Sequence, residues 1–461
     1  MSTKSGAVKG GFFERTFHLS NKNTTVKKEC VAGLTTFLTM VYIVAVNPSI
    51  LAVTGMDPTA LFWSTAVSSA IACFAIGVYG NFPFALAPSM GLNAYFAYSV
   101  CGDMGLTWQQ GLGCVFISGM LFVVLGFFKV QQKVVDDLPD VIKHSVGAGV
   151  GFFIALIGLK NAGLVTPNSD TLVALGDLGN PGTLLALFGI ILTAVLVIKK
   201  VPGGILISII VVTIVGIFVK DPSTGLSYTV LPEKLISFQN PVEALAPTFG
   251  KLSLSGMFSG SAANVISVIF IMISFFFVDL FGSVGVLLGL ADSADMLDEN
   301  GNVPGAGKAL FISAAGAAVG AVLGTSTVTI YGAESATGIA EGGRTGLVAW
   351  VVGILFVLTL FFSPVFLMIP TVATAPALVM VGTFMIEPLC HLDLSDLRVA
   401  FPAFLTVAMM PFTYNLAYGI LFGLLAYTLV TVASKKAKEI TPTVWVLTAL
   451  FAGYFIMDVF L

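Results

Sequence analysis

Two acidic residues stand apart because they lie deep inside long apolar runs. Of the 24 aspartates and glutamates in the chain, only Asp279 and Glu334 are placed in this way. A carboxylate in hydrocarbon is costly, so it is retained where it faces a protein-lined cavity. A carboxyl group in such surroundings can exchange a proton near neutral pH. The sequence therefore predicts a buried site for a substrate or a proton.

The composition places the chain in a membrane. Hydrophobic residues make up 57% of the sequence, charged residues 10%, and the mean hydropathy is +0.99. No lysine or arginine occurs between Lys28 and Lys129. Residues 1–29 are too polar for a cleavable signal peptide. We expect a multi-pass protein of the cell membrane, surrounded by lipid and without a nucleic-acid partner.

The residue pattern gives no support for enzyme chemistry. The five cysteines show no paired spacing and the three histidines are scattered. No nucleophile–base pair or metal cluster is recognisable in the sequence. We predict no enzyme activity, no metal and no cofactor.

Apolar runs long enough to cross about 30 Å of hydrocarbon recur along the whole chain. They predict an all-α polytopic fold with fourteen transmembrane spans. A further run at 442–460 is either an interfacial segment or a fifteenth crossing. The expected spans are 30–54, 59–80, 82–100, 107–128, 141–164, 182–199, 203–219, 262–290, 306–322, 324–340, 345–367, 370–388, 397–413 and 415–433.

Basic residues predict the orientation, because Lys and Arg favour the cytoplasmic side of a membrane. Counting crossings places three basic clusters on the same side as the N-terminus, which is therefore expected to be cytoplasmic. The clusters are Lys4, Lys9, Arg15, Lys22, Lys27 and Lys28, then Lys199 and Lys200, then Lys435, Lys436 and Lys438.

The two halves of the chain resemble each other. Residues 60–66 read ALFWSTA and residues 309–315 read ALFISAA, while 121–128 (LFVVLGFF) parallels 355–362 (LFVLTLFF). Seven spans separate the copies, and an odd number inverts the second copy in the membrane. We predict seven plus seven inverted repeats. Chance similarity between apolar helices is the alternative explanation.

The repeat places four polar side chains at related depths. Asn47 corresponds to Asp279, and Asn93 corresponds to Glu334. Transporters built from inverted repeats bind substrate near the midplane at such positions. For Asn47 and Asn93, hydrogen bonding between helices without ligand contact is the alternative role.

The third and tenth spans are poor continuous helices. Pro83 and Pro88 interrupt residues 80–93, and β-branched residues including Thr329 interrupt residues 324–338. Each segment predicts a short β-strand that leads into a half-helix. The amides at the start of a half-helix attract electron-rich ligand groups, and such irregular backbone survives only where it lines protein or water.

Several blocks resemble the AzgA-like purine permeases, a branch of the nucleobase–cation symporter family. These blocks are residues 31–51, 84–98, 151–163, 324–347 and 373–382. The resemblance implies a core domain of spans 1–4 and 8–11, a gate domain of spans 5–7 and 12–14, and proton-coupled transport by an elevator-like movement. The expected boundaries are 1–29 (cytoplasmic segment), 30–128 (core), 129–219 (gate), 220–258 (polar linker), 259–367 (core) and 368–461 (gate).

The resemblance also marks Asn93 and Glu334 as substrate contacts. It places Gly282, followed by Ser283, where the family carries an aspartate, and Asp279 lies one helical turn earlier. Asp279 either takes over that role or never touches ligand. The interval from Tyr331 through Gly332 to Glu334 is longer than in the family.

We therefore expect an importer that carries a purine base of the hypoxanthine/guanine class together with a proton. Glu334 would bind ring N–H groups, while Asn93, Ser89 and the half-helix amides would recognise carbonyl and ring-nitrogen atoms. Asp279, together with Glu334, would couple the proton. A homodimer is a further expected partner state. The alternatives are a carrier of the same fold for an anion or another small solute, and a channel.

Overall fold

The structure is a computed structural model that describes residues 11–127, 137–258, 262–298 and 303–460. Outside these residues lie Lys4 and Lys9 of the basic N-terminal cluster and the expected domain boundaries at 128–129 and 259. The fold is predominantly helical. Its helices are α1 (Phe12–Phe17), α2 (Val26–Met40), α3 (Ile43–Leu51), α4 (Pro58–Ala75), α5 (Met90–Ala94), α6 (Trp108–Phe127), α8 (Asp140–Asn161), α9 (Pro181–Ile198), α10 (Gly204–Gly216), α11 (Pro241–Leu245), α12 (Ala262–Ser293), α13 (Ala306–Leu323), α14 (Gly332–Ala340), α15 (Leu347–Thr359), α16 (Ser363–Leu367), α17 (Thr371–Phe384), α18 (Leu397–Phe412), α19 (Leu416–Ala433) and α20 (Pro442–Phe460).

Shorter elements complete the chain. The strands are β1 (Leu86–Pro88), β2 (Val165–Asn168), β3 (Leu172–Leu175) and β4 (Val328–Ile330). A π-helix, η4 (Tyr95–Asp103), continues α5, and another, η3 (Ile76–Gly80), continues α4. Short 3₁₀ turns are η1 (Leu19–Lys22), η2 (Ala52–Thr54), η5 (Leu360–Phe362), η6 (Glu387–His391) and η7 (Ala437–Glu439).

Ten helical segments in the described residues are long and apolar enough to cross a membrane. They confirm a multi-pass membrane protein. The other expected spans correspond to two segments broken by β1 and β4 and to the shorter helices α10 and α18. Fourteen crossings therefore remain a prediction. The C-terminal α20 is also apolar, and a short apolar helix of this kind is compatible with either role considered for 442–460.

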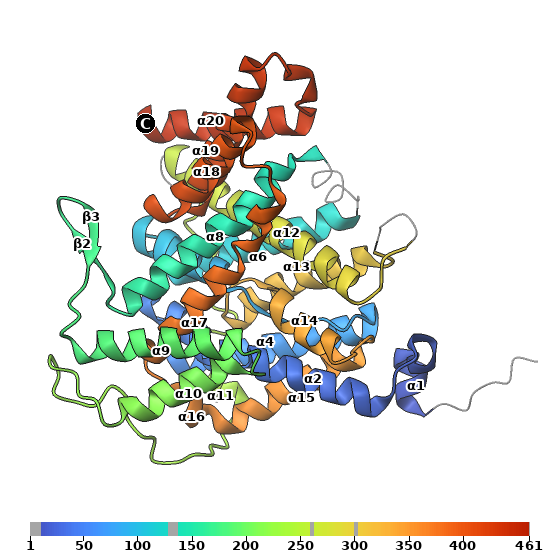
Figure 1. Cartoon of the computed structure of the whole chain (residues 1–461), viewed down its shortest axis with the longest axis vertical. Coiled ribbons are helices and arrows are strands. Elements are labelled where there is room, and N and C mark those ends of the chain that lie inside the picture. Colours follow the sequence, from blue (N-terminus) through green and yellow to red (C-terminus); the bar gives the residue numbers. More distant parts are fainter. Residues whose placement is uncertain (1–10, 128–136, 259–261, 299–302, 461) are drawn as a thin grey trace, which may run out of the picture.

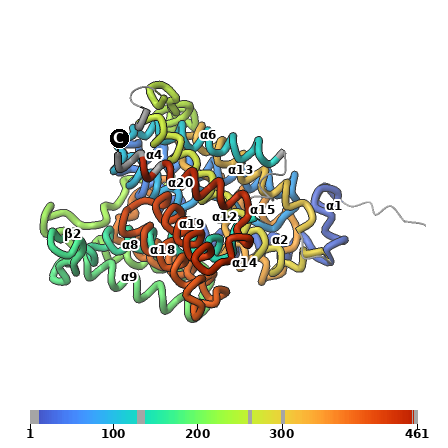
Figure 2. Tube along the Cα trace, turned by 90° about the horizontal axis from the view of Figure 1, so that it is seen from above, coloured from blue at the N-terminus to red at the C-terminus, as the bar shows by residue number. Residues whose placement is uncertain are grey.

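The helices pack in two groups. One contains α8, α9, α10, α17, α18 and α19, and the other contains α2, α3, α4, α6, α12, α13, α14 and α15. Figure 1 shows α9 and α10 of the first group at the lower left and α2, α13 and α14 of the second on the right, and Figure 2 separates α8, α9 and α18 from α2, α13 and α14. Between the groups, α5 and α12 contact α8. The half-helix α5 thus lies where the groups meet.

Side-chain contacts bring several helix ends together in pairs. The Lys308 ammonium lies 5.2 Å from the ring centre of Tyr79, and Arg344 Nη2 lies 3.8 Å from Asp295 Oδ2. The rings of His144 and His391 are 6.0 Å apart. These contacts join the start of α8 to the end of η6, and the end of α12 to the loop after α14.

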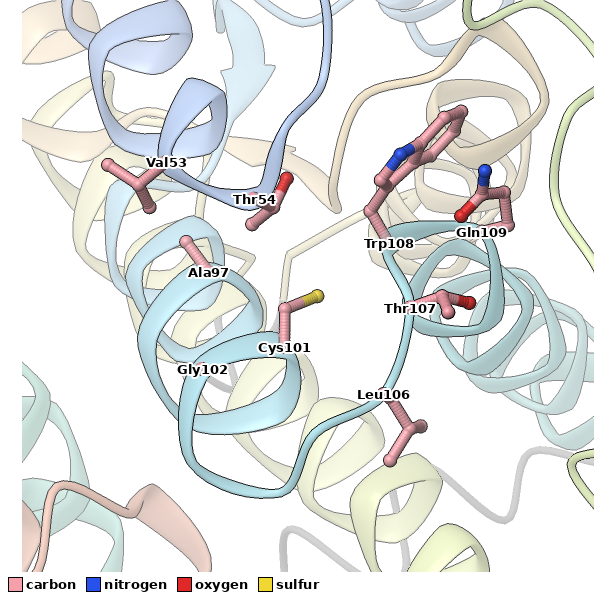
Figure 3. A pocket seen from close by; sticks show the side chains of 9 residues that line it. All are labelled: Val53, Thr54, Ala97, Cys101, Gly102, Leu106, Thr107, Trp108 and Gln109. Atoms are coloured by element: carbon pink, nitrogen blue, oxygen red, sulfur yellow. The ribbon is translucent and has the colours of Figure 1, made fainter.

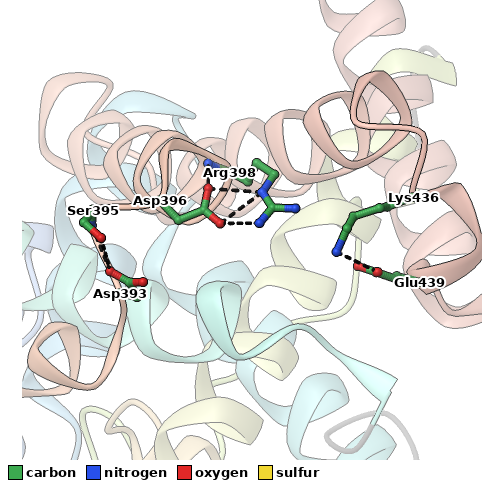
Figure 4. Close-up of polar contacts among 6 residues, drawn as sticks. All are labelled: Asp393, Ser395, Asp396, Arg398, Lys436 and Glu439. Carbon is green, nitrogen blue, oxygen red and sulfur yellow. Dashed lines mark hydrogen bonds and ion pairs between the residues drawn. The ribbon is translucent and has the colours of Figure 1, made fainter.

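The start of α18 lies on a polar edge (Figure 4). Asp396 caps this helix by accepting from the Arg398 N–H at 2.9 Å, and its carboxylate also binds the Arg398 side chain. These bonds hold the pKa of Asp396 below its ordinary value. Lys436 pairs with Glu439 at 2.9 Å on the turn after α19.

A second set of contacts gathers the opposite helix ends beneath the 220–258 segment. The Trp63 indole N–H donates to Gln239 at 3.0 Å, and Ser253 N donates to the Gln109 carbonyl at 2.9 Å. Gly250 N donates to the Val322 carbonyl at 2.8 Å. The segment expected to be a polar linker therefore covers the starts of α4 and α6 and the end of α13.

Two local features were not expected from the sequence. β2 and β3 form an antiparallel hairpin beyond α8, with Val165 opposite Leu175. The first span is interrupted at Val41–Tyr42, between α2 and α3. Tyr42 therefore lies at a bend, and its side chain is completely buried.

Candidate substrate site

The site is built on a two-stranded sheet inside the helical protein. β1 and β4 pair antiparallel, with Ala87 opposite Thr329. β1 leads into α5 and β4 leads into α14, which confirms the strand and half-helix predicted for the third and tenth spans. Ser89 N donates to the Thr327 carbonyl at 2.8 Å, and the Tyr331 hydroxyl donates to the Pro88 carbonyl at 2.6 Å. These bonds fix the two half-helix starts against each other.

Glu334 lies in the first turn of α14, where the helix dipole favours a negative charge. Its side chain is buried, and Oε1 accepts a 2.7 Å hydrogen bond from the Tyr42 hydroxyl. Tyr42 is the one side chain among the described residues that hydrogen-bonds this carboxylate. The carboxylate can therefore accept a hydrogen bond from a ligand while Tyr42 holds its other oxygen.

Asn93 and Asn47 lie together in a second network. Asn93 Nδ2 donates to Asn47 Oδ1 at 2.6 Å, and Asn47 Nδ2 donates to Thr65 Oγ1 at 2.6 Å and Thr325 Oγ1 at 2.9 Å. All four side chains are buried. Asn93 Oδ1 is buried without a hydrogen-bond partner in the described residues. Asn47 thus links α4, α5 and the segment before β4 through hydrogen bonds.

Asp279 lies in a third network, between α12 and α13. Ser283 donates to Asp279 Oδ1 at 3.1 Å and lies 3.1 Å from the Ser313 hydroxyl. Asp279 is only 3% exposed, whereas Gly282 is exposed and a Cβ added there would meet no atom within 4 Å. The two positions differ: Gly282 faces open space and Asp279 does not.

The remaining predicted residues lie on the strand and half-helix segments. Ser89 and Thr329 are half-buried although their neighbours in the sequence are buried. Gly332 begins α14, and a Cβ on it would lie 3.2 Å from Val286 Cγ1 of α12. Ala333, the next residue, is exposed. This first turn of α14 therefore has one accessible side despite its depth in the fold.

A third buried carboxylate was missed by the sequence reasoning. Glu29 is 0% exposed and accepts from Thr24 Oγ1, from Arg344 N at 2.9 Å and from Thr345 Oγ1 at 2.7 Å. Arg344 Nη1 in turn donates to the Ile339 carbonyl at 2.7 Å, near the end of α14. This cluster ties the start of α2 to the half-helix that carries Glu334. Its sequence signal is weak, because Glu29 stands beside polar residues.

A cavity of about 400 Å³ lies away from the strand crossing (Figure 3). It is bounded by the end of the first span, by η4 and by the start of α6, and Cys101 and Trp108 line it. Ala97 and Cys101 follow Asn93 along the same helical segment, but Asn93 itself is completely buried. The cavity is therefore separate from the polar networks.

Comparison with proteins of known sequence identifies close relatives of similar length. A permease of Methanocaldococcus jannaschii is 45% identical and covers 96% of this chain and 98% of its own. The Adenine permease AdeQ of Escherichia coli is 39% identical, covering 96% of both chains. The Guanine/hypoxanthine permease PbuG of Bacillus subtilis is also 39% identical, covering 95% of this chain and 98% of its own. These relatives are permeases and not enzymes.

Comparison with solved structures identifies the fold. The transmembrane domain of the cyanobacterial bicarbonate transporter BicA superposes with a TM-score of 0.59 at 15% identity, covering 88% of this chain and 97% of that one. The overall arrangement is thus that of a known transporter fold. Residues 27–422 match the model of the Xan_ur_permease group, described as the Permease family, and this chain therefore belongs to that family.

Proposed function

We propose that the protein imports a purine base of the hypoxanthine/guanine class together with a proton. The observation that carries the proposal is the half-helix pair: Glu334 and Asn93 sit at its two starts, and Asn93 Oδ1 has no hydrogen-bond partner among the described residues. Relatives at equal identity are named for adenine in one case and for guanine and hypoxanthine in the other. Asn93 donates through Nδ2 to Asn47 and, in the part of the chain that the structure describes, leaves its Oδ1 as a free acceptor, which favours the guanine and hypoxanthine class.

In this proposal the base lies between the half-helices. Glu334 Oε2 and Asn93 Oδ1 accept N–H groups of the base. Ser89 and the amides in the first turns of α5 and α14 recognise its carbonyl and ring-nitrogen atoms, because those amides have no partner within their own helix. Thr329 and Gly332 line the same crossing, where a small residue leaves room for the ligand.

Proton coupling is assigned to Glu334 and Asp279. Glu334 would bind the base while ionised or while sharing a proton, so that the base and the proton are carried together. Asp279 sits one helical turn from the open position Gly282, and the hydroxyls of Ser283 and Ser313 can rotate to follow its protonation state. Proton movement would therefore alter contacts beside the half-helices.

The two helix groups support the proposed core and gate domains with an elevator-like movement between them. The first group holds the helices of the expected spans 5–7 and 12–14, and the second holds those of spans 1, 2, 4 and 8–11. Two hydrogen-bond networks involve the matched segments: Asn47 bonds to Thr65 in ALFWSTA, while Asp279 connects through Ser283 to Ser313 in ALFISAA. The N-terminus and the face that carries Arg344 and Lys308 are proposed to be cytoplasmic.

One observation favours a second candidate, a carrier of the same fold for an anion. Gly282 removes an acid from the open position, which lowers the electrostatic penalty for a negative ligand. A channel is a third candidate, which differs by lacking concentrative transport.

Uptake into proteoliposomes separates these candidates. An inward proton gradient should drive labelled hypoxanthine above equilibrium, and a protonophore should abolish the excess. Unlabelled purines should compete, whereas bicarbonate, chloride and sulfate should not. Competition by anions alone would favour the second candidate, and uptake that only equilibrates would favour a channel.

A further inference from the structure

The orientation of the Asn93 amide can be traced to a helix carbonyl. The Thr65 hydroxyl lies 2.6 Å from the Leu61 carbonyl oxygen, which can only accept a hydrogen bond. The single proton of Thr65 is therefore used in that bond. Its oxygen can only accept from other neighbours, and the neighbour at 2.6 Å is the Asn47 amide.

This restriction passes from Thr65 to Asn47. The amide group that faces Thr65 must be the NH₂ group, because the hydroxyl has no proton left to donate. The same NH₂ group reaches Thr325 Oγ1 at 2.9 Å. Asn47 Oδ1 is consequently on the other side, where it faces Asn93.

The same argument then fixes Asn93. An amide oxygen only accepts, so Asn93 must turn its NH₂ group toward Asn47, and the distance is 2.6 Å. Asn93 Oδ1 is left buried and unpaired among the described residues. A buried acceptor without a partner is unfavourable, so a ligand that supplies an N–H group there gains from it.

We propose that Asn47 and Thr65 are positioning residues that hold the Asn93 oxygen toward the ligand. The inference rests on the proposed function, and it names the substrate class of that site. Asn93 and Glu334 then present acceptors from two different half-helices, which suits a base with N–H groups at two ring positions. Hypoxanthine and guanine have an N1–H and an imidazole N–H, whereas adenine has one ring N–H and a lone pair at N1. The chain of hydrogen bonds from Leu61 through Thr65 and Asn47 to Asn93 is called the relay below. It thereby selects 6-oxopurines over adenine.

The direct test removes the two hydroxyl groups that orient the Asn47 amide. In the Thr65→Val/Thr325→Val double variant, both acceptors of the Asn47 amide are replaced by groups of similar shape. Asn47 and Asn93 can then rotate, so Asn93 can offer its NH₂ group to the N1 lone pair of adenine. The ratio of adenine to hypoxanthine inhibition constants should fall by about tenfold or more, the scale of one hydrogen bond inside a protein.

Two control variants change the same helix but leave the Thr65 hydroxyl, and therefore the relay, in place. Thr65→Ser retains the hydroxyl, and Ser69→Ala removes a neighbouring hydroxyl that donates to the Thr65 carbonyl at 2.7 Å. Both variants should leave the ratio of adenine to hypoxanthine inhibition constants within about twofold of the wild type, because substitutions that spare the relay have small effects. A merely structural defect would weaken both bases together and leave the ratio unchanged, and that outcome would overturn the inference.

A measurement on the wild-type protein covers the case in which the double variant does not fold. Competition by 1-methylhypoxanthine and by 9-methylhypoxanthine should each be at least about tenfold weaker than by hypoxanthine, because each analogue lacks one ring N–H. Equal competition by either analogue, or a wild-type preference for adenine, would refute the two-donor requirement. If no base binds at all, the proposed function fails instead, so the two failures are distinguishable.

Discussion

Replacing Glu334 by glutamine should do more than remove a charge, because Tyr42 dictates how the new amide is oriented. The Tyr42 hydroxyl donates a hydrogen bond to Glu334 Oε1 at 2.7 Å. In Glu334→Gln the amide oxygen would take the place of Oε1 beside Tyr42. The NH₂ group would then face the ligand, where the base also presents a donor.

The size of the effect follows from two losses. A hydrogen bond to a charged group contributes about 1.5–3 kcal/mol, and a buried donor left unpaired costs about 1–3 kcal/mol. The smallest sum of the two losses is about 2.5 kcal/mol, and since about 1.4 kcal/mol is a factor of ten, hypoxanthine binding should weaken at least about 60-fold. Adding Tyr42→Phe removes the hydroxyl that orients the amide, so the glutamine can turn its oxygen to the ligand. The double variant should then recover about tenfold of the lost affinity.

The assay is a double-mutant cycle on purified protein, with hypoxanthine affinity measured by calorimetry or by ligand-dependent thermal stabilisation. Tyr42→Phe alone should weaken binding, because Glu334 loses the group that positions it. The same substitution should strengthen binding in the Glu334→Gln background. This reversal of sign is the critical result. A Tyr42→Phe effect of the same sign in both backgrounds would refute the assigned orientation.

Three further predictions concern coupling and stability. Asp279→Asn should keep hypoxanthine binding within about threefold of the wild type while abolishing proton-driven accumulation, since its contacts are to Ser283 on the same helix; equal loss of both in binding and uptake assays would contradict this role. Gly346→Ala should lower the melting temperature, because the new Cβ would overlap the Gly77 carbonyl oxygen, and overpacking of this kind costs about 1–3 kcal/mol; Gly289→Ala, with no atom within 4 Å, is the control. Asp396→Ala should lower the melting temperature at neutral pH, and the difference should shrink in acid, because the stability from a carboxyl with a depressed pKa is lost as the pH falls through its folded-state pKa; a difference that stays unchanged in acid would rule out the capping charge as its cause.

Local backbone chemistry made the broken spans predictable from sequence. Pro83 and Pro88 prevent a continuous helix in the third span, and the β-branched residues around Thr329 favour a strand in the tenth. The register of the pair, with Leu86 opposite Ile330, depends on a contact across more than half of the chain. Sequence periodicity holds no information about that register.

The candidate site was predictable only in part, for a similar reason. Isolation in apolar sequence revealed Asp279 and Glu334, and both are buried in the structure. Tyr42 and Thr65 look like ordinary packing residues within their helices. Their importance comes from partners 292 and 18 residues away in sequence, which only the folded chain brings together. The β2–β3 hairpin did carry a local signal in the turn-forming residues 168–171, between two apolar–polar stretches.

Direct observation of the bound base would test the central claim, which is that ligand binds between the starts of α5 and α14. An experimental density map of the protein with hypoxanthine should show the ring within hydrogen-bond distance of Glu334 Oε2 and Asn93 Oδ1, with Tyr42 still bonded to Oε1. Density for the base in the cavity beside Cys101 and Trp108, with both acceptors left unoccupied, would contradict the account.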